Sequence, residues 1–321
     1  MGPHMIRPSL ALLCAVATSA CGSGTTVAAT APSADAGTST DAGATGSDGG
    51  TPGCDLSFSV PNTSAKVNAT SVSAWTCTGT TRTMTGNGIP DHAVTGGNFA
   101  TPVGAQNLNV RFPLQPARAS ASTSPRRQAL GYVLNSVKLD PMTDGSCSAT
   151  ATSTQPGGGC VAAMGRDPWN LEAIGGAFAF GTDESNAHTQ PNGQYHYHGM
   201  PEAYLTRKGA GEKVTLVGFA MDGFPIYARY GYATATDASS AVRVMKGSYR
   251  TKATPDAGRP SSTTFPMGTF VQDWEYSEGL GDLDECNGRT GVTPEYPAGT
   301  YHYYITDTYP FIQRCYKGTA L

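Results

Sequence analysis

The chain has 321 residues, with 21 Lys and Arg against 24 Asp and Glu, which gives a formal net charge of −3 and a pI near 6.1. This balance provides no basic surface of the kind that nucleic acid requires, so no nucleic-acid partner is expected. The 40 Gly and 22 Pro residues favour short strands joined by long loops over a helical architecture.

The N-terminal residues predict export from the cytoplasm. Met1–Met5 reads as an expression scar, and an arginine, an apolar run from Leu10 to Thr18 and small residues then lead to Cys21. This order indicates a lipoprotein-type signal peptide over residues 1–21, with a lipid anchor at Cys21. Because Thr18 replaces the leucine that usually precedes such a cysteine, ordinary signal cleavage near an alanine is the alternative.

Residues 22–53 are predicted to form a flexible tether. They are almost entirely Gly, Ala, Ser, Thr, Asp and Pro, which bury too little apolar surface to offset the entropy of ordering. A tether after a lipidated cysteine would hold a domain at the periplasmic or outer surface of a bacterial membrane. Residues 54–321 contain neither a run of ~18 apolar residues nor a composition break, so we expect one large exported domain there.

Six cysteines follow the signal, and an even number in an exported chain predicts disulfides. Six cysteines allow 15 connectivities, and we favour sequential pairing because each bond then closes a short loop. The absence of Cys-x-x-Cys spacing argues against a thiolate metal site. The predicted pairs are Cys54 with Cys77, Cys147 with Cys160, and Cys286 with Cys315.

The pattern of apolar residues predicts a mainly β fold. Alternating or continuous apolar runs indicate strands, whereas a helical period appears only weakly, around Trp169–Ala177. We expect a single large disulfide-bonded domain, sandwich or barrel-like, with long loops. The predicted strands are Gln106–Leu114, Tyr132–Leu139, Gln194–His198, Val214–Ala220, Pro225–Tyr232, Phe270–Tyr276 and Gly299–Tyr304.

The stretch Asn192–Gly199, NGQYHYHG, organises the prediction of function. Side chains alternate between the two faces of a strand, so His196 and His198 share one face, opposite two tyrosines. Histidines two residues apart on a strand lie about 6.5–7 Å apart at Cα, which lets both imidazoles reach one metal ion. Alone, such a pair is equally well explained as polar residues on the wet face of a sheet.

A second stretch repeats the pattern near the C-terminus. Gly299–Tyr304, GTYHYY, places His302 where His196 stands in the first stretch. If the two strands pair, three of the six histidines of the chain converge on one face.

Two further histidines are candidates for a fourth ligand. His92 follows Asp91 in a turn that contains Gly88, and His188 lies eight residues before His196 in a polar stretch. We favour His92 because its turn reads as constrained. Each is equally compatible with a solvent-facing loop histidine.

Asp282 and Asp284 lie in a loop, Gly281–Gly288, whose carboxylates suggest calcium binding. The spacing of an EF-hand is absent, so an acidic loop fixed by a disulfide is the alternative.

An imidazole-only ligand set suits zinc, copper, iron or nickel. With His196, His198, His302 and His92 as candidate ligands, we expect copper binding, for metal capture or redox chemistry. A zinc hydrolase that uses metal-bound hydroxide is the first alternative. The second is a carbohydrate- or protein-binding surface without metal, which a separation of more than about 10 Å between His302 and His196 would favour, since metal–imidazole bonds are near 2 Å.

Three motifs together resemble the YHYH-domain family of exported bacterial proteins, over roughly Asn87 to Gly318. They are Tyr195–Pro201 (YHYHGMP), Gly218–Tyr227 (GFAMDGFPIY) and Asp282–Gly288 (DLDECNG). The resemblance implies the class of protein, and no reaction is attached to the family. Its name-giving histidines correspond to His196 and His198.

Overall fold

The computed structural model describes residues 51–125 and 129–321, and every structural statement refers to these residues. The predicted signal peptide and most of the predicted tether lie outside them. Within the described ranges, no helix is long and apolar enough to cross a membrane.

An antiparallel sheet of four strands begins the described chain. Its burial alternates along each strand, and Trp75, Met84 and Phe112 turn inward. The alternation of the sequence therefore produces one wet face and one buried face. The strands, in sheet order, are β1 Leu56–Asn62, β2 Ala69–Thr78, β3 Thr81–Gly86 and β4 Leu108–Pro113.

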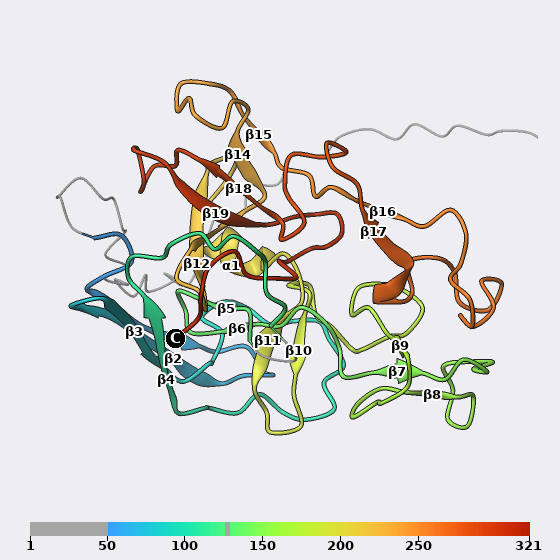
Figure 1. The fold of residues 1–321 in the computed structure, drawn as a ribbon. Helices are drawn as coiled ribbons and strands as arrows, with labels where there is room; N and C mark the ends of the chain where they lie inside the picture. The colour runs from blue at the N-terminus through green and yellow to red at the C-terminus, as the bar shows by residue number, and fades with distance from the viewer. Residues whose placement is uncertain (1–50, 126–128) are drawn as a thin grey trace, which may run out of the picture. The chain divides into compact units, whose positions relative to one another are not determined.

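An eight-stranded mixed sheet forms the centre of the molecule (Figure 1). Four of its eight strands are buried along their whole length. In sheet order they are β10 Ala187–Thr189, β11 Tyr195–Tyr197, β6 Lys138–Leu139, β5 Gly131–Val133, β12 Thr215–Ala220, β13 Pro225–Ala228, β19 Thr300–Ile305 and β18 Gly288–Gly291.

The two sheets pack against each other through an aromatic cluster. Trp75 and Phe112 of the small sheet meet Tyr132 and Phe219 of the large one, and the Trp75 Nε1–H donates to the carbonyl of Leu134 at 2.8 Å. Figure 1 shows the small sheet beside β5 and β6. The predicted mainly β fold is confirmed, and its architecture is sandwich-like, because the large sheet stays open from β10 to β18 instead of closing into a barrel.

Several segments differ from the predicted elements. Tyr132–Leu139 is two strands separated by a turn in which Ser136 has φ +64°, and the weak helical period at Trp169–Ala177 is a short strand followed by turns. Phe270–Tyr276, predicted as one strand, contains a 3₁₀ helix over Val271–Asp273 and a strand over Trp274–Tyr276. The remaining elements are β7 Ser146–Cys147, β8 Cys160–Val161, β9 Trp169–Asn170, α1 Glu202–Arg207, β14 Tyr230–Tyr232, β15 Val242–Val244, β16 Tyr249–Thr251, η1 Val271–Asp273 and β17 Trp274–Tyr276.

Three disulfides cross-link the chain, and they confirm the sequential pairing. They join Cys54 to Cys77, Cys147 to Cys160, and Cys286 to Cys315. The second bond links β7 to β8, and the third ties the loop before β18 to the C-terminal segment. Closing these loops restricts the unfolded chain and so stabilises a fold that is rich in irregular structure.

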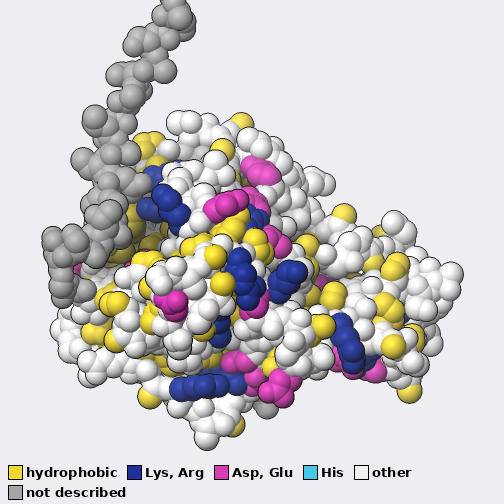
Figure 2. Space-filling view, turned by 90° about the horizontal axis from the view of Figure 1, so that it is seen from above, with side chains coloured by type: hydrophobic (Ala, Val, Ile, Leu, Met, Phe, Trp, Pro, Cys, Tyr) yellow, Lys and Arg dark blue, Asp and Glu magenta, His cyan; other side chains and the backbone are white. Residues whose placement is uncertain are grey.

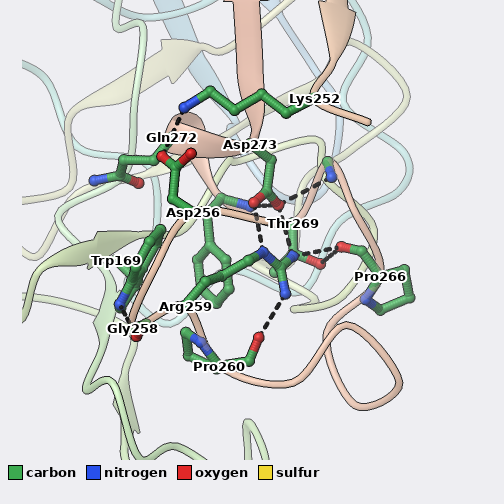
Figure 3. Close-up of polar contacts among 12 residues, drawn as sticks. Trp169, Lys252, Asp256, Gly258, Arg259, Pro260, Pro266, Thr269, Gln272 and Asp273 are labelled. Atoms are coloured by element: carbon green, nitrogen blue, oxygen red, sulfur yellow. Dashed lines mark hydrogen bonds and ion pairs between the residues drawn. The ribbon is translucent and has the colours of Figure 1, made fainter. Parts of the chain in front are cut away.

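A buried ion pair stabilises the part of the chain around β9 and β17 (Figure 3). Arg259 Nε and Nη2 donate to Asp273 Oδ1 and Oδ2 at 2.6 and 2.7 Å, and the two side chains are 0% and 1% exposed. Asp273 Oδ2 also accepts hydrogen bonds from the backbone N–H groups of Gly268 and Phe270, at 3.0 Å each. The carboxylate thus organises a loop and neutralises a buried cation at the same time.

Removal of this carboxylate should strongly destabilise the fold. We expect Asp273→Ala to lower the free energy of unfolding by about 3–5 kcal/mol, because it leaves the Arg259 charge buried without a partner. Urea denaturation followed by tryptophan fluorescence measures this change. Asp256→Ala, which breaks the more exposed pair with Lys252 in the same region, is the matched control and should cost less than about 1 kcal/mol. Equal losses in the two variants would contradict this account.

Candidate metal centre

The hairpin formed by β10 and β11 positions the histidines. Its turn is closed by hydrogen bonds from Gln190 N–H to Gln194 O at 2.9 Å and from Gly193 N–H to Gln190 O at 2.8 Å. Gly193 has φ +81°, a conformation that favours glycine. The resulting antiparallel register places His188 directly opposite His196.

The other face of β11 is anchored by its two tyrosines, which are fully buried. The Tyr195 hydroxyl donates to Asp183 Oδ2 at 2.5 Å. The Tyr197 hydroxyl lies 2.6 Å from His92 Nε2 and accepts a hydrogen bond from Asn135 Nδ2 at 3.2 Å. Burial raises the pKa of both tyrosines well above the usual value, so both phenols are neutral donors.

On the opposite face, His188, His196 and His198 form a compact cluster, hereafter the histidine triad. One potential ligand atom from each residue lies within 4.8 Å of the other two, and the ring centroids are 4.7–4.9 Å apart. Nε2 of His188 and Nε2 of His198 are 3.1 Å apart. Nitrogen ligands at 2.0–2.1 Å from a tetrahedral ion lie about 3.3 Å from one another. The Nε2 atoms of His188 and His198 therefore have nearly the spacing that one metal ion needs, and a nitrogen of His196 lies within 4.8 Å of them.

Backbone carbonyls orient two of the three rings. His188 Nδ1 lies 2.7 Å from Phe180 O, and His196 Nδ1 lies 3.1 Å from Gln194 O. A carbonyl oxygen can only accept a hydrogen bond, so each Nδ1 carries the hydrogen and each Nε2 carries the lone pair. This arrangement, in which a second contact fixes the tautomer, is the usual setting of a metal-binding histidine.

The third ring shows an unsatisfied buried atom. Without an ion, His198 Nε2–H donates to His188 Nε2 and the lone pair of His198 lies on Nδ1, whereas an ion between the two Nε2 atoms would replace this hydrogen bond. Among the described residues, the buried His198 Nδ1 has no hydrogen-bond partner. A buried imidazole cluster with an unsatisfied nitrogen is costly without a ligand, and its neutral nitrogen donors fit a metal ion.

Burial keeps the triad neutral. His196 and His198 are 3% and 1% exposed, and His188 is half-buried. Burial lowers the pKa of all three imidazoles, for His196 and His198 well below the usual value. The three rings are therefore neutral at neutral pH, and each has one unprotonated nitrogen, as metal binding requires. The molecular face drawn in Figure 2 shows no histidine patch, which agrees with this burial.

An ion pair lies beside the triad. Lys138, which is paired with His196 across β6 and β11, contacts Asp140 at 2.7 Å, and Gln190 Nε2 donates to Asp140 Oδ2 at 3.2 Å. The positive charge of Lys138 contributes to the lowered pKa of His196 and His198, whereas Asp140 opposes this effect at His198. Asp140 is thus a carboxylate near the triad that can offset the charge of a bound cation.

The structure does not bring His302 to the triad. β11 and β19 do not pair, because β6, β5, β12 and β13 lie between them, a separation of roughly 24 Å for five interstrand steps of about 4.8 Å. The expectation that the two similar strands are neighbours is wrong. His302 Nδ1 instead contacts Thr300 O at 3.0 Å and His302 Nε2 contacts the Tyr304 hydroxyl at 3.0 Å.

His92 also lies away from the triad, on the tyrosine side of β11. Its Nδ1 contacts Ala93 O at 2.9 Å, so its Nε2 accepts the proton of the Tyr197 hydroxyl. His188, the less favoured of the two candidates for a fourth ligand, supplies the third imidazole. The loop sequence between His188 and His196, with Pro191, Asn192 and Gly193, is a hairpin signal that would have identified this pairing.

The two aspartates considered for calcium have other partners. Asp282 accepts hydrogen bonds from Arg243 and from the backbone N–H of Lys246. Asp284 accepts from the backbone N–H groups of Cys286 and Gly288 and from the Tyr301 hydroxyl. These donors occupy the carboxylate oxygens that a calcium ion at this loop would need.

Taken together, three disulfides, an open mainly β fold and a buried histidine triad define a protein built for an oxidising compartment, with a site suited to imidazole chemistry. A family model described as "YHYH protein" matches residues 109–318, and the chain belongs to this family. Family membership and disulfides agree with an exported protein. No curated protein and no solved structure matches the chain significantly.

The burial of His302 predicts a pH-dependent stability. Burial lowers the pKa of His302 from 6.5 to about 4, so between these pH values the unfolded chain binds a proton that the folded protein excludes. Stability is therefore lost as the pH falls through this window. We expect the metal-free His302→Gln variant to lose less, with a slope shallower by up to about 1.4 kcal/mol per pH unit.

Urea denaturation at several pH values within the window measures both slopes. The comparison between wild type and variant cancels the opposite contribution of buried carboxyls such as Asp222, whose pKa burial raises. Parallel slopes for the two proteins would show that His302 does not titrate as described.

Proposed function

We propose that this protein binds a transition-metal ion, with copper the expected ion, through the imidazoles of His188, His196 and His198. The observation that carries the proposal is the convergence of three neutral imidazoles, with 3.1 Å between Nε2 of His188 and Nε2 of His198. The buried His198 Nδ1, which lacks a hydrogen-bond partner among the described residues, adds to it. His188 replaces His302 and His92 in the predicted ligand set. The separation of roughly 24 Å between the strands of His302 and His196 exceeds the ~10 Å limit set above and so supports the alternative of a surface without metal. The three convergent histidines, which include His188, support metal binding instead.

The character of the ligand set supports copper. Neutral imidazoles suit copper and zinc, and at a given nitrogen site Cu(II) binds more tightly than the other divalent ions of the first row. A bound ion would supply Lewis acidity or one-electron chemistry. The chain itself orients the rings of His188 and His196 through Phe180 O and Gln194 O, and burial keeps the imidazoles neutral.

A zinc hydrolase remains the second candidate, because three histidines leave one coordination position for water. The two pockets described beside α1 and beside Asp282, of about 310 and 390 Å³, are not lined by any residue of the triad. A hydrolase would also need room for its substrate next to the metal, which neither of these two pockets provides.

Metal analysis tests the proposal directly. We expect about one copper ion per chain in protein purified without a His tag from the periplasm, and loss of this ion in His188→Ala and in His196→Ala/His198→Ala. Cu(II) spectra should show imidazole nitrogen ligands in the wild type. His302→Gln is the matched control: it replaces a buried strand histidine outside the triad and should keep the metal.

The same measurement separates the alternatives. One zinc ion per chain, with turnover of a model ester that a chelator abolishes, would favour the zinc hydrolase over copper binding. A folded wild type that takes up neither copper nor zinc would overturn metal binding. The aromatic residues would then be examined as a carbohydrate- or protein-binding surface.

We also propose that the protein is a lipoprotein anchored at Cys21, supported by the signal-like order of residues 1–21. The full-length natural precursor should fractionate with membranes, and Cys21→Ser should move the mature domain into the soluble exported fraction. Mass spectrometry of residue 21 gives an independent measure. Soluble wild-type protein, cleaved at a nearby alanine, would contradict the anchor.

A further inference from the structure

The large sheet contains an internal repeat centred on β5 and β12. These two strands pair antiparallel, and their following strands, β6 and β13, each form a hairpin with them. The sequences GYVLNSVKL, from Gly131, and GFAMDGFPI, from Gly218, align without a gap. Both glycines lie where the backbones of the two paired strands approach closely. A Cβ on Gly131 would lie 2.4 Å from Phe219 O, and a Cβ on Gly218 would lie 2.1 Å from Tyr132 O.

Backbone hydrogen bonds repeat along with the sequence. Leu134 N–H donates to Val217 O at 2.8 Å, and Met221 N–H, at the corresponding position, donates to Leu130 O at 2.9 Å. The turn residue has a positive φ in both copies, +64° at Ser136 in the first and +90° at Gly223 in the second. The sheet order then runs symmetrically outward, from β5 through β6 and β11 to β10, and from β12 through β13 and β19 to β18.

The outer hairpins repeat in the same detail. Asp183 Oδ1 accepts the N–H groups two and four residues later, at 2.8 and 3.1 Å, and Asp284 Oδ1 does the same at 3.0 and 3.1 Å. Tyr195 donates to Asp183, and Tyr301, the matching tyrosine, donates to Asp284. The residue three positions after each aspartate, Asn186 or Asn287, has a positive φ.

The register of these hairpins assigns a counterpart to each triad residue. Arg289 lies opposite His302 as His188 lies opposite His196, and Tyr304 follows His302 by two residues as His198 follows His196. The orientation of the central ring is also kept, since His302 Nδ1 contacts Thr300 O as His196 Nδ1 contacts Gln194 O.

The side chains of this second set bond to one another, although the buried Arg289 Nε has no hydrogen-bond partner among the described residues. Because His302 Nδ1–H donates to Thr300 O, its Nε2 accepts the proton of the Tyr304 hydroxyl at 3.0 Å. Arg289 Nη2 donates to the Tyr304 hydroxyl at 3.3 Å and to Tyr232 O at 2.8 Å. Tyr227 packs its ring 5.4 Å from that of His302. A fixed cation and two phenols thus take up the space that is lined by imidazoles in the first copy.

We propose that Arg289, His302 and Tyr304 are a latent second metal site, a copy of the histidine triad in which Arg289 and Tyr304 replace two of the three imidazoles. The inference rests on the proposed function for the identity of the ligand, and on the repeat for its location. Two substitutions, Arg289→His and Tyr304→His, restore three imidazoles on the same backbone frame.

Copper and zinc titrations of the whole protein test the proposal, with bound ion per folded chain as the readout. We expect Arg289→His/Tyr304→His to bind one ion more than the wild type, which doubles the ratio from one to two. In the His196→Ala/His198→Ala background the same pair should bind one ion, and addition of His302→Gln should abolish it. A folded Arg289→His/Tyr304→His variant that binds no more ion than the wild type would overturn the proposal.

The reciprocal exchange supplies a readout that does not depend on metal. His188→Arg/His198→Tyr should build the Arg–Tyr–His contacts in the first copy, so that its thermal unfolding midpoint exceeds that of His188→Ala/His198→Ala. A midpoint equal to or below that of the alanine variant would contradict the equivalence of the two sites. This comparison serves as the test if Arg289→His/Tyr304→His does not fold. Failure of the proposed function alone has a distinct signature: a metal-free wild type beside an Arg289→His/Tyr304→His variant that binds one ion.

Discussion

The carboxylate of Asp183 is the contact on which the geometry of the histidine triad depends. One oxygen accepts two backbone N–H groups and folds the loop before β10, while the other accepts the hydroxyl of Tyr195 on β11. Burial raises the pKa of this carboxyl, and the same burial strengthens each hydrogen bond that it makes. Because Asp183 joins both strands from the tyrosine face, the register that sets His188 opposite His196 follows from it.

The two faces of β11 illustrate two ways of satisfying buried polar groups. On the tyrosine face every hydroxyl has a partner within the protein, at Asp183, His92 or Asn135. On the histidine face, His198 Nδ1 has no hydrogen-bond partner within the part of the chain that the structure describes. Since an unsatisfied buried acceptor costs about 1–3 kcal/mol, its persistence at the centre of an otherwise well-bonded hairpin is understandable if a ligand normally satisfies the cluster.

The sequence predicted local features well and neighbour relations poorly. The mainly β fold, the three disulfides and the alternation of His196 and His198 against Tyr195 and Tyr197 depend on short-range patterns, and all are present. The assignment of His302 to the same cluster depended on which strands are neighbours, and this is set by the packing of β5 against β12 in the centre of the sheet. A local pattern carries no information about that order. His188 was within reach of prediction, because a five-residue turn fixes the residue opposite His196.

The comparison of the two hairpins explains why a similar strand sequence leads to different chemistry. β11 and β19 share the Tyr-His-Tyr pattern, the same faces and the same orientation of the central imidazole. Two positions differ: Arg289, a permanent cation, lies across the hairpin where His188 lies in the first copy, and Tyr304 on the strand itself corresponds to His198. A guanidinium has no lone pair to offer a metal and repels a second cation, so the residue on the partner strand opposes a bound ion. Under the proposed function, metal binding therefore depends on the pairing of two strands as well as on the strand that carries the motif.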